Sequence, residues 1–146
     1  MTTFVTCTRR IQFCAGHRVH LHESKCANMH GHNYVALFEA NAACLDSIGR
    51  VIDFSVLKEK IGGWIDENWD HGFIYRANDL EVAEALDSVP GQKRYTMLTN
   101  PTAENMAMYL LNEVCPEVLK GTDVDVVKVT LWETENCFAE VVRDID

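Results

Sequence analysis

The chain has 146 residues, of which 22 are acidic and 13 basic, and 47% are hydrophobic. This length predicts a single domain over residues 1–146 that buries a core without help from a disulfide or a metal. The formal net charge of −9 argues against general nucleic-acid binding, because such binding depends on Lys and Arg side chains that neutralise phosphates. No stretch is apolar and long enough to span a bilayer, and the first 13 residues alternate instead of forming a basic and then apolar leader. We therefore expect a cytoplasmic protein with free thiols at its six scattered cysteines.

Two strands are predicted in the first third of the chain. Residues 4–13 (FVTCTRRIQF) alternate apolar and polar side chains, and residues 33–42 (NYVALFEANA) are rich in β-branched and aromatic residues. Residues 14–32 are expected to form a loop that carries five of the six histidines. Four basic residues against one acidic residue in positions 1–25 indicate either a local anion site or a solvated strand face.

Two helices and a hairpin follow these strands. Asp53 or Ser55 caps a helix that ends near Asn68, and residues 72–99 are irregular apart from a short helix in DLEVAEALD. A second helix starts at Asn100 and Pro101 and ends at Pro116. Residues 123–132 and 137–143 alternate as two hairpin strands. The order ββααββ predicts an α+β domain in which both helices cover one face of a four-stranded antiparallel sheet. Oligomerisation is the natural way to cover the other face.

The spacing of three histidines predicts a metal site. His30 and His32 lie two residues apart at the start of the second predicted strand, so their side chains point to the same face. Gly31 between them leaves the opposite face uncrowded. His17, which follows the first strand in FCAGHR, is the nearest candidate for a third ligand. Three neutral imidazoles with one open position are the arrangement of a catalytic zinc.

Other arrangements stay open on spacing alone. His20 and His22 form a second HxH pair, although they lie in mid-loop where no strand fixes their direction. Cys26 could be a fourth ligand that closes a structural zinc site. Alternatively, its thiol, next to Lys25, could accept a proton or act as a nucleophile, or it could simply be a small apolar residue.

Further polar residues lie where elements begin or end. Asp70 precedes His71 just beyond the first helix, so the carboxylate could orient the imidazole for proton transfer. Glu133 follows the apolar strand VTLW, where a carboxylate either anchors a ligand with two N–H donors or faces solvent. Thr102 and Glu104 begin the second helix and either line a site or only cap the helix.

Six motifs in order resemble the 6-pyruvoyl-tetrahydropterin synthase / 6-carboxy-tetrahydropterin synthase family: FCAGHR, CANMHGHNY, VIDFSVLK, WDH, NPTAEN and ETENCFAEV. The resemblance runs from about residue 4 to residue 142. It implies a tunnelling fold, in which three subunits close a barrel and two trimers stack into a homohexamer. That assembly would cover the bare face of the sheet.

The resemblance also implies roles for the candidate residues. Cys26 matches the catalytic cysteine and is not a ligand, while Asp70 and His71 match the rest of a proton-transfer group assembled at a subunit interface. Glu133 matches the carboxylate that anchors the pterin ring, and Thr102 and Glu104 fall in the stretch that lines the same pocket. The family's zinc ligands fall on His17, His30 and His32.

The implied substrate is 7,8-dihydroneopterin triphosphate. Its phosphates need local cations on an acidic protein, so we expect contributions from the basic residues of the first segment. These candidates are Arg9, Arg10, Arg18 and Lys25.

The three residues between Cys26 and HGH resemble the carboxy-forming branch of the 7-deazaguanine (queuosine) route. A zinc-dependent lyase of this branch makes 6-carboxy-5,6,7,8-tetrahydropterin and releases acetaldehyde and triphosphate. The alternatives are the pyruvoyl-forming synthase of the biopterin route, a non-catalytic zinc-binding module, and a metal-dependent hydrolase that uses the same histidines.

Overall fold

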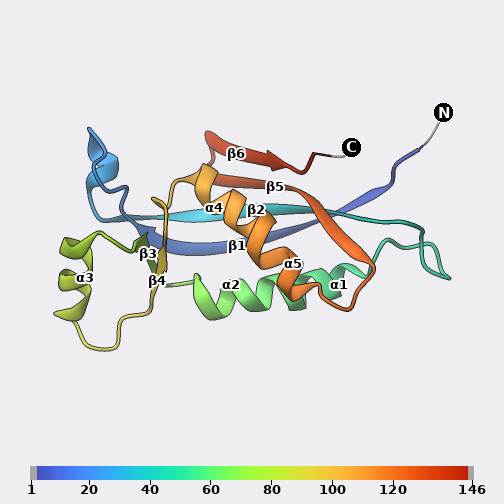
Figure 1. Ribbon diagram of the computed structural model, residues 1–146, viewed down its shortest axis with the longest axis horizontal. Coiled ribbons are helices and arrows are strands. Elements are labelled where there is room, and N and C mark those ends of the chain that lie inside the picture. The colour runs from blue at the N-terminus through green and yellow to red at the C-terminus, as the bar shows by residue number, and fades with distance from the viewer. Residues whose placement is uncertain (1–2, 145–146) are drawn as a thin grey trace.

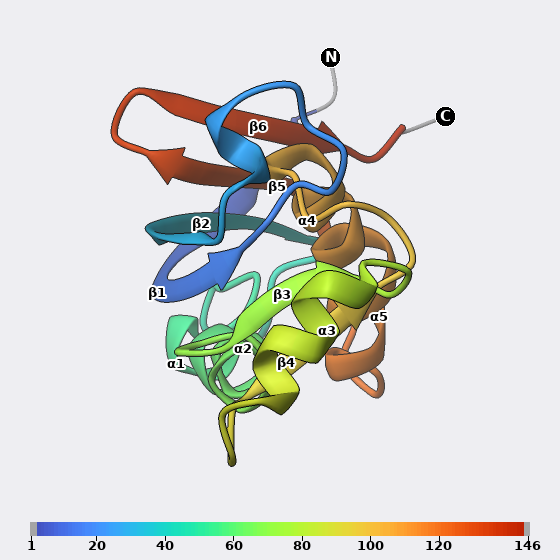
Figure 2. The same ribbon diagram turned by 90° about the vertical axis from the view of Figure 1, so that its left-hand side faces the viewer.

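The computed structural model describes residues 3–144, which form one six-stranded sheet with two long helical segments packed on one face (Figures 1 and 2). The strand order is β4-β3-β1-β2-β5-β6. In this part of the chain no helix is long and apolar enough to cross a membrane. All six cysteines carry free thiols.

The predicted α+β fold with an antiparallel four-stranded sheet is confirmed. β1 pairs with β2, β2 with β5 and β5 with β6, all antiparallel. The first two strands reach farther into the histidine segment than predicted, because their hydrogen-bonded ladder continues to the pair His17 and His30. The four bounds are Thr6–His17, His30–Ala42, Val124–Thr134 and Cys137–Val142.

The expectation of only four strands was wrong. β3 (Phe73–Arg76) and β4 (Arg94–Met97) extend the sheet beyond β1 as parallel strands, with α3 (Leu80–Asp87) between them. Ile74 joins the main core, whereas Tyr75 packs with Val82 and Leu86 of α3. Successive strand residues point to opposite faces, so α3 covers the face of this extension that lies away from the main core. Four-residue strands carry too little alternation to be recognised from sequence.

The first long helix begins at Asp53, whose side chain accepts a hydrogen bond from the Ser55 N–H. It comprises α1 (Phe54–Leu57), a π-helical segment (Lys58–Gly62) and α2 (Gly63–Asn68). Its predicted end near Asn68 is confirmed. Its buried face, Leu57, Ile61 and Ile65, packs on the sheet.

The second long helix differs from its prediction at both ends. The N-cap is Thr102, which accepts from the Asn105 N–H, and α4 (Ala103–Tyr109) continues through a π-helical segment (Leu110–Val114) into α5 (Cys115–Val118). Pro116 therefore lies inside the helix. Proline has no N–H to donate to the preceding turn, and the Arg143 guanidinium donates instead to the Leu111 carbonyl at 3.2 Å.

Candidate metal centre and surrounding site

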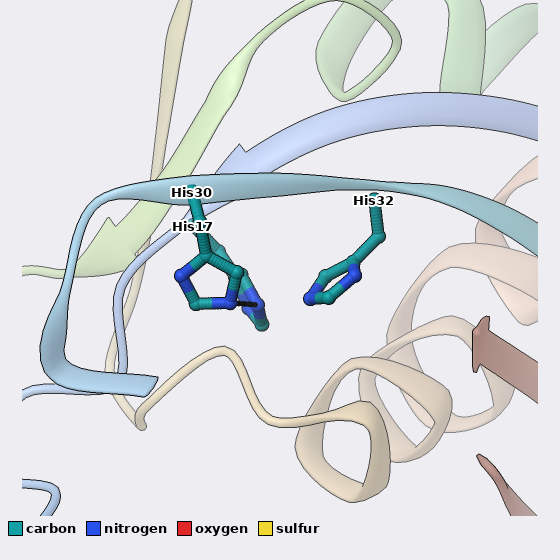
Figure 3. Close-up of side chains that lie close together, drawn as sticks. All are labelled: His17, His30 and His32. Carbon is teal, nitrogen blue, oxygen red and sulfur yellow. Dashed lines mark hydrogen bonds between the residues drawn. The ribbon is translucent and has the colours of Figure 1, made fainter. Parts of the chain in front are cut away.

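The three predicted metal ligands come together at the end of the β1–β2 hairpin (Figure 3). His17 pairs directly with His30 across the two strands, and His32 lies on the same face of β2. This face continues the buried stripe of Phe13, Ala15 and Tyr34. Strand alternation thus directs all three imidazoles to the core-facing side of the sheet, where their donor nitrogens lie within 4.8 Å of one another.

The histidine cluster fits a metal ion in its hydrogen bonding. His17 Nδ1 donates to the Pro101 carbonyl at 2.8 Å and His30 Nδ1 donates to the Asn28 carbonyl at 2.6 Å. Because a carbonyl only accepts, both protons sit on Nδ1, and the Nε2 lone pairs of His17 and His30 face each other at 3.1 Å. A tetrahedral zinc with bonds near 2.05 Å separates two nitrogens by about 3.3 Å.

Burial disfavours the protonated form of two of the three histidines. Burial lowers the pKa of His17 to about 4, although the Pro101 carbonyl opposes the shift. Burial also lowers the pKa of His32, against an opposing effect of the Glu133 carboxylate. The Nε2 atom of His32 is buried without a hydrogen-bond partner. Neutral imidazoles with free lone pairs are what a divalent cation requires.

Glu133 lies at the margin of the histidine cluster. It follows Trp132 in β5, and its Oε1 atom is 3.4 Å from His32 Nε2. Its side chain is 24% exposed, so one side of the carboxylate remains open. Burial, with a contribution from Glu133, raises the pKa of Tyr34 beneath it. The carboxylate that follows VTLW is partly buried, and it lies beside the metal ligands.

Cys26 lies in the connection between β1 and β2, residues 18–29, which we call the Cys26 loop. Its one regular turn is a 3-10 helix over Lys25–Ala27, and the Val19 N–H donates to the Cys26 carbonyl at 2.9 Å. The thiol is half-buried and belongs to neither of the two potential metal-ligand groups found in residues 3–144.

The second of these groups contains Asp70 and His71, together with a residue that the sequence interpretation missed. His71 Nδ1 lies 2.9 Å from Asp70 Oδ2, and Cys14 Sγ lies 3.5 Å from His71 Nε2. Burial would raise the pKa of Asp70, but the Cys14 N–H and His71 lower it below its usual value. Only the alternation of β1, which turns Cys14 away from His17, hinted at its position. The contact joins residues 56 positions apart in the sequence, so local patterns do not reveal it.

A cavity of about 340 Å³ connects this group with the histidine strand. Its lining residues include Cys14, His71, Gly31 and His32. Because Cys14 points away from His17 in β1, this cavity lies on the face of the sheet opposite the imidazoles of the candidate metal centre.

The remaining predicted residues are dispersed. Thr102 is the N-cap of α4 and Glu104 is exposed in its first turn. Arg18 Nε lies 3.3 Å from the fully buried Asp79 carboxylate, so this guanidinium is already paired. Lys25 is exposed on the Cys26 loop.

Arg10 lies apart from the histidine cluster. It lines a separate cavity of about 430 Å³ with Arg9 and Lys58. Seven residues separate Arg10 from His17 along β1, which corresponds to about 23 Å.

Comparison with known proteins identifies the family of this chain. Residues 6–144 match the family model described as 6-pyruvoyl tetrahydropterin synthase. The chain is 44% identical over 137 residues to the 6-carboxy-5,6,7,8-tetrahydropterin synthase of Rickettsia bellii, which covers 94% of this chain and 99% of that protein. It is 34% identical over 123 residues to the synthase of the same name from Aquifex aeolicus, covering 80% and 75% of the two chains.

Solved structures show the same fold. The 6-pyruvoyl tetrahydropterin synthase of Caenorhabditis elegans superposes with a TM-score of 0.70 at 27% identity over 97% of both chains. An uncharacterized protein from Wolinella succinogenes superposes with a TM-score of 0.80 at 22% identity, over 98% of this chain and 100% of that one.

Proposed function

We propose, because this chain belongs to the 6-pyruvoyl tetrahydropterin synthase family, that it is a carboxy-forming, zinc-dependent lyase. Its substrate would be 7,8-dihydroneopterin triphosphate, and its products 6-carboxy-5,6,7,8-tetrahydropterin, acetaldehyde and triphosphate. This reaction belongs to 7-deazaguanine (queuosine) synthesis in the cytoplasm. The observation that carries the proposal is the cluster of three histidines beside the Glu133 carboxylate, in a chain whose relatives are named for the carboxy product.

The proposed zinc ligands are the Nε2 atoms of His17, His30 and His32. When bound there, zinc would polarise the substrate's side-chain oxygens and make the neighbouring C–H more acidic. The hydrogen bonds from His17 to Pro101 and from His30 to Asn28 fix the ring orientations and leave Nε2 free for the metal.

Glu133 is the proposed anchor for the pterin ring. A carboxylate with two acceptor oxygens pairs with two N–H groups on one edge of such a ring. Its distance of 3.4 Å from His32 would hold the ring next to the metal centre. Thr102 and Glu104, at the start of α4, are proposed to line the same pocket.

Cys26, Asp70 and His71 are proposed to move protons during the reaction. The Asp70 carboxylate accepts the Nδ1 proton of His71, which leaves Nε2 to accept a proton from substrate or thiol. Within one chain Asp70 and His71 lie next to Cys14 and not next to Cys26. We propose that a homohexamer, a dimer of trimers, brings His71 of one subunit to Cys26 of another.

The substrate's triphosphate requires cations at the site. Lys25, exposed next to Cys26, is the proposed contact within the chain. Arg18 would first have to leave Asp79, and Arg10 would have to serve the site of a neighbouring subunit. Replacing Lys25 with Ala should raise KM for the triphosphate, while unchanged affinity would remove it from the proposal.

The proposal is tested by incubating the zinc-loaded protein with dihydroneopterin triphosphate and analysing the pterin by mass and the volatile product as acetaldehyde. Carboxy-pterin with stoichiometric acetaldehyde is the expected result. Pyruvoyl-pterin without acetaldehyde would instead assign the biopterin route. No turnover would overturn both, provided that the metal content is one per chain. Glu133→Gln is the matched control for the proposed pterin anchor, because the amide keeps the shape of the Glu133 side chain and removes its charge.

The reactivity and replaceability of Cys26 distinguish the proposed lyase from a non-catalytic zinc module and from a metal-dependent hydrolase. In the enzyme the thiol is free, so iodoacetamide should alkylate Cys26 and abolish turnover while zinc stays bound. In a non-catalytic zinc module the thiolate would be a ligand and resist alkylation. In a metal-dependent hydrolase, Cys26→Ser would keep its activity.

A further inference from the structure

Cys14, Asp70 and His71 form a second compact set of metal-ligating side chains, which we call the thiol cluster. One donor atom of each residue lies within 4.8 Å of the other two. Cys14 Sγ is 3.7 Å from His71 Nδ1 and 3.9 Å from Asp70 Oδ1, and His71 Nδ1 is 2.9 Å from Asp70 Oδ2. The residues come from β1 and from the turn that follows α2, and they line the 340 Å³ cavity described above at Cys14 and His71.

These separations match the edges of a coordination tetrahedron. Zinc binds sulfur at about 2.3 Å and nitrogen or oxygen at about 2.0–2.2 Å, which places sulfur about 3.6 Å from either second ligand. The two sulfur distances observed, 3.7 Å to His71 Nδ1 and 3.9 Å to Asp70 Oδ1, are close to this value. A cation therefore fits between the three side chains with little rearrangement.

The main chain holds the thiol cluster in place. The Cys14 N–H donates to Asp70 Oδ1 at 3.0 Å, and the His71 N–H donates to the Cys14 carbonyl at 2.7 Å. His71 adopts a φ of 60°, in the left-handed region that residues other than glycine seldom occupy. Lys93 also donates to the Asp70 carbonyl at 2.6 Å. These contacts fix the turn on β1, so the donors are oriented before a ligand arrives.

The pairing of Asp70 with His71 further suits metal binding. His71 Nδ1 lies 2.9 Å from Asp70 Oδ2, so an ion that replaces the Nδ1 proton would contact both the imidazole and the carboxylate. The other carboxylate oxygen, Oδ1, faces Cys14. The side chain of His71 is 77% exposed within one chain, which leaves room for a fourth ligand. One thiolate, one imidazole and one carboxylate favour a borderline or soft divalent ion such as Zn²⁺, Co²⁺ or Cd²⁺.

We propose that the thiol cluster is a second divalent-metal site, distinct from the histidine cluster, with Cys14 Sγ, His71 Nδ1 and the Asp70 carboxylate as its ligands. A second consequence rests on the proposed function. An ion bound here occupies both His71 and Asp70 and therefore inhibits proton transfer. The first metal equivalent per chain then supports turnover, and the second suppresses it.

The binding test uses Co²⁺ as the probe on the whole metal-free protein, because a cobalt–thiolate bond gives a charge-transfer absorption that imidazole ligands do not. We expect two equivalents per chain, with the thiolate band growing as the thiol cluster fills. Cys14→Ser should remove the band and weaken the corresponding Kd more than about tenfold while one equivalent still binds. His30→Ala should keep the band and lose the other equivalent.

Cys26→Ser is the matched thiol control and should leave the cobalt–thiolate band intact. Loss of the band in Cys26→Ser but not in Cys14→Ser would overturn the proposal and assign the thiolate to the histidine cluster. Binding of only one equivalent would also overturn it.

The inhibition test adds Zn²⁺ beyond one equivalent and measures turnover relative to the one-equivalent form of each variant. The unmodified protein should lose activity, and Cys14→Ser should lose much less. If binding of the second equivalent is observed but the protein has no pterin activity at one equivalent, the metal site stands and the proposed function fails. If activity is present and excess Zn²⁺ has no effect on it, the inhibitory role fails alone.

Discussion

The histidine cluster and the Cys26 loop are neighbours in sequence, yet they are held by different kinds of interaction. The histidine cluster is positioned by the main-chain ladder of β1 and β2, with His17 opposite His30. The Cys26 loop is tied to other parts of the chain by side chains. Arg18 and His20 approach the buried Asp79 at 3.3 and 3.7 Å, and Asn100 exchanges two hydrogen bonds with the His20 main chain.

This difference separates the metal ligands from the proposed proton-transfer thiol. Ligand geometry that follows strand pairing survives the loss of any one side chain. The loop depends on a few polar contacts, several of them to the segment that carries β3, α3 and β4. Substitutions should therefore divide into those that remove the metal without moving the loop, and those that release the loop without removing the metal.

The largest expected effect is loss of metal in His30→Ala. A zinc site of this kind binds with about 10–16 kcal/mol, so removing one of three protein ligands should cost about 4 kcal/mol, or about a thousandfold in affinity. The strands should persist, since their pairing is made by the main chain. Metal titration measures the loss of affinity, and far-ultraviolet circular dichroism measures whether the strands persist. His22→Ala, in the Cys26 loop, is the control and should bind metal normally, and equal loss in both variants would contradict the distinction.

The next largest effect is expected from Asp79→Ala. Removing a carboxylate that is fully buried against Arg18 should destabilise the protein by about 3 kcal/mol, because the guanidinium loses its partner and α3 loses its N-cap. Chemical unfolding of the metal-free protein measures this change. The control is Asp87→Ala, since the Asp87–Arg94 pair is exposed and should contribute less than about 1 kcal/mol. Similar losses of stability in the two variants would show that the buried Asp79 contributes no more than the exposed Asp87.

A smaller effect is expected from Asn100→Ala. Two hydrogen bonds to the His20 main chain are lost, which should cost about 1–2 kcal/mol and loosen the Cys26 loop. Turnover should fall several-fold while metal affinity stays within about twofold. Asn136→Ala, in the exposed β5–β6 turn, serves as the control. A fall in metal affinity equal to the fall in turnover would mean that the loop and the histidine cluster are coupled.

The smallest effect is a difference in thiol reactivity between the second long helix and the Cys26 loop. Burial raises the pKa of Cys115, in the second long helix, to about 12, and its side chain is 1% exposed. It should stay protonated and unreactive toward a disulfide reagent at pH 8, whereas half-buried Cys26 should react within the folded state. Mass mapping of labelled peptides over time distinguishes them. Labelling of Cys115 at the rate of Cys26 would show that the helical core opens as readily as the loop.

Sequence alone predicted what depends on local periodicity. The two-residue spacing of His30 and His32 placed both on one face, and the same alternation continued in β1 puts His17 beside them. The apolar stripes of both long helices were likewise visible, as was the strand that leads to Glu133.

Long-range contacts escaped the sequence interpretation. The pairing of β3 with Gly16 and His17, at the end of β1, follows from folding of the whole chain and not from the four residues of β3. The Cys14–Asp70 contact was hidden for the same reason. Pro116 misled the prediction of a helix end, because the Arg143 side chain compensates for its missing N–H from 27 positions away in the sequence.

The single hairpin that supplies all three histidines also has a consequence for the order of events during folding. His17 and His30 are only 13 residues apart, whereas Asp70 lies 56 residues from its partner Cys14. Contacts of short sequence separation close quickly, and chains emerge from the ribosome beginning with the N-terminus. We expect the metal-binding hairpin to be complete in a nascent chain that has not yet synthesised either long helix. Zinc captured at that stage would bias the hairpin toward its native register before the rest of the sheet exists.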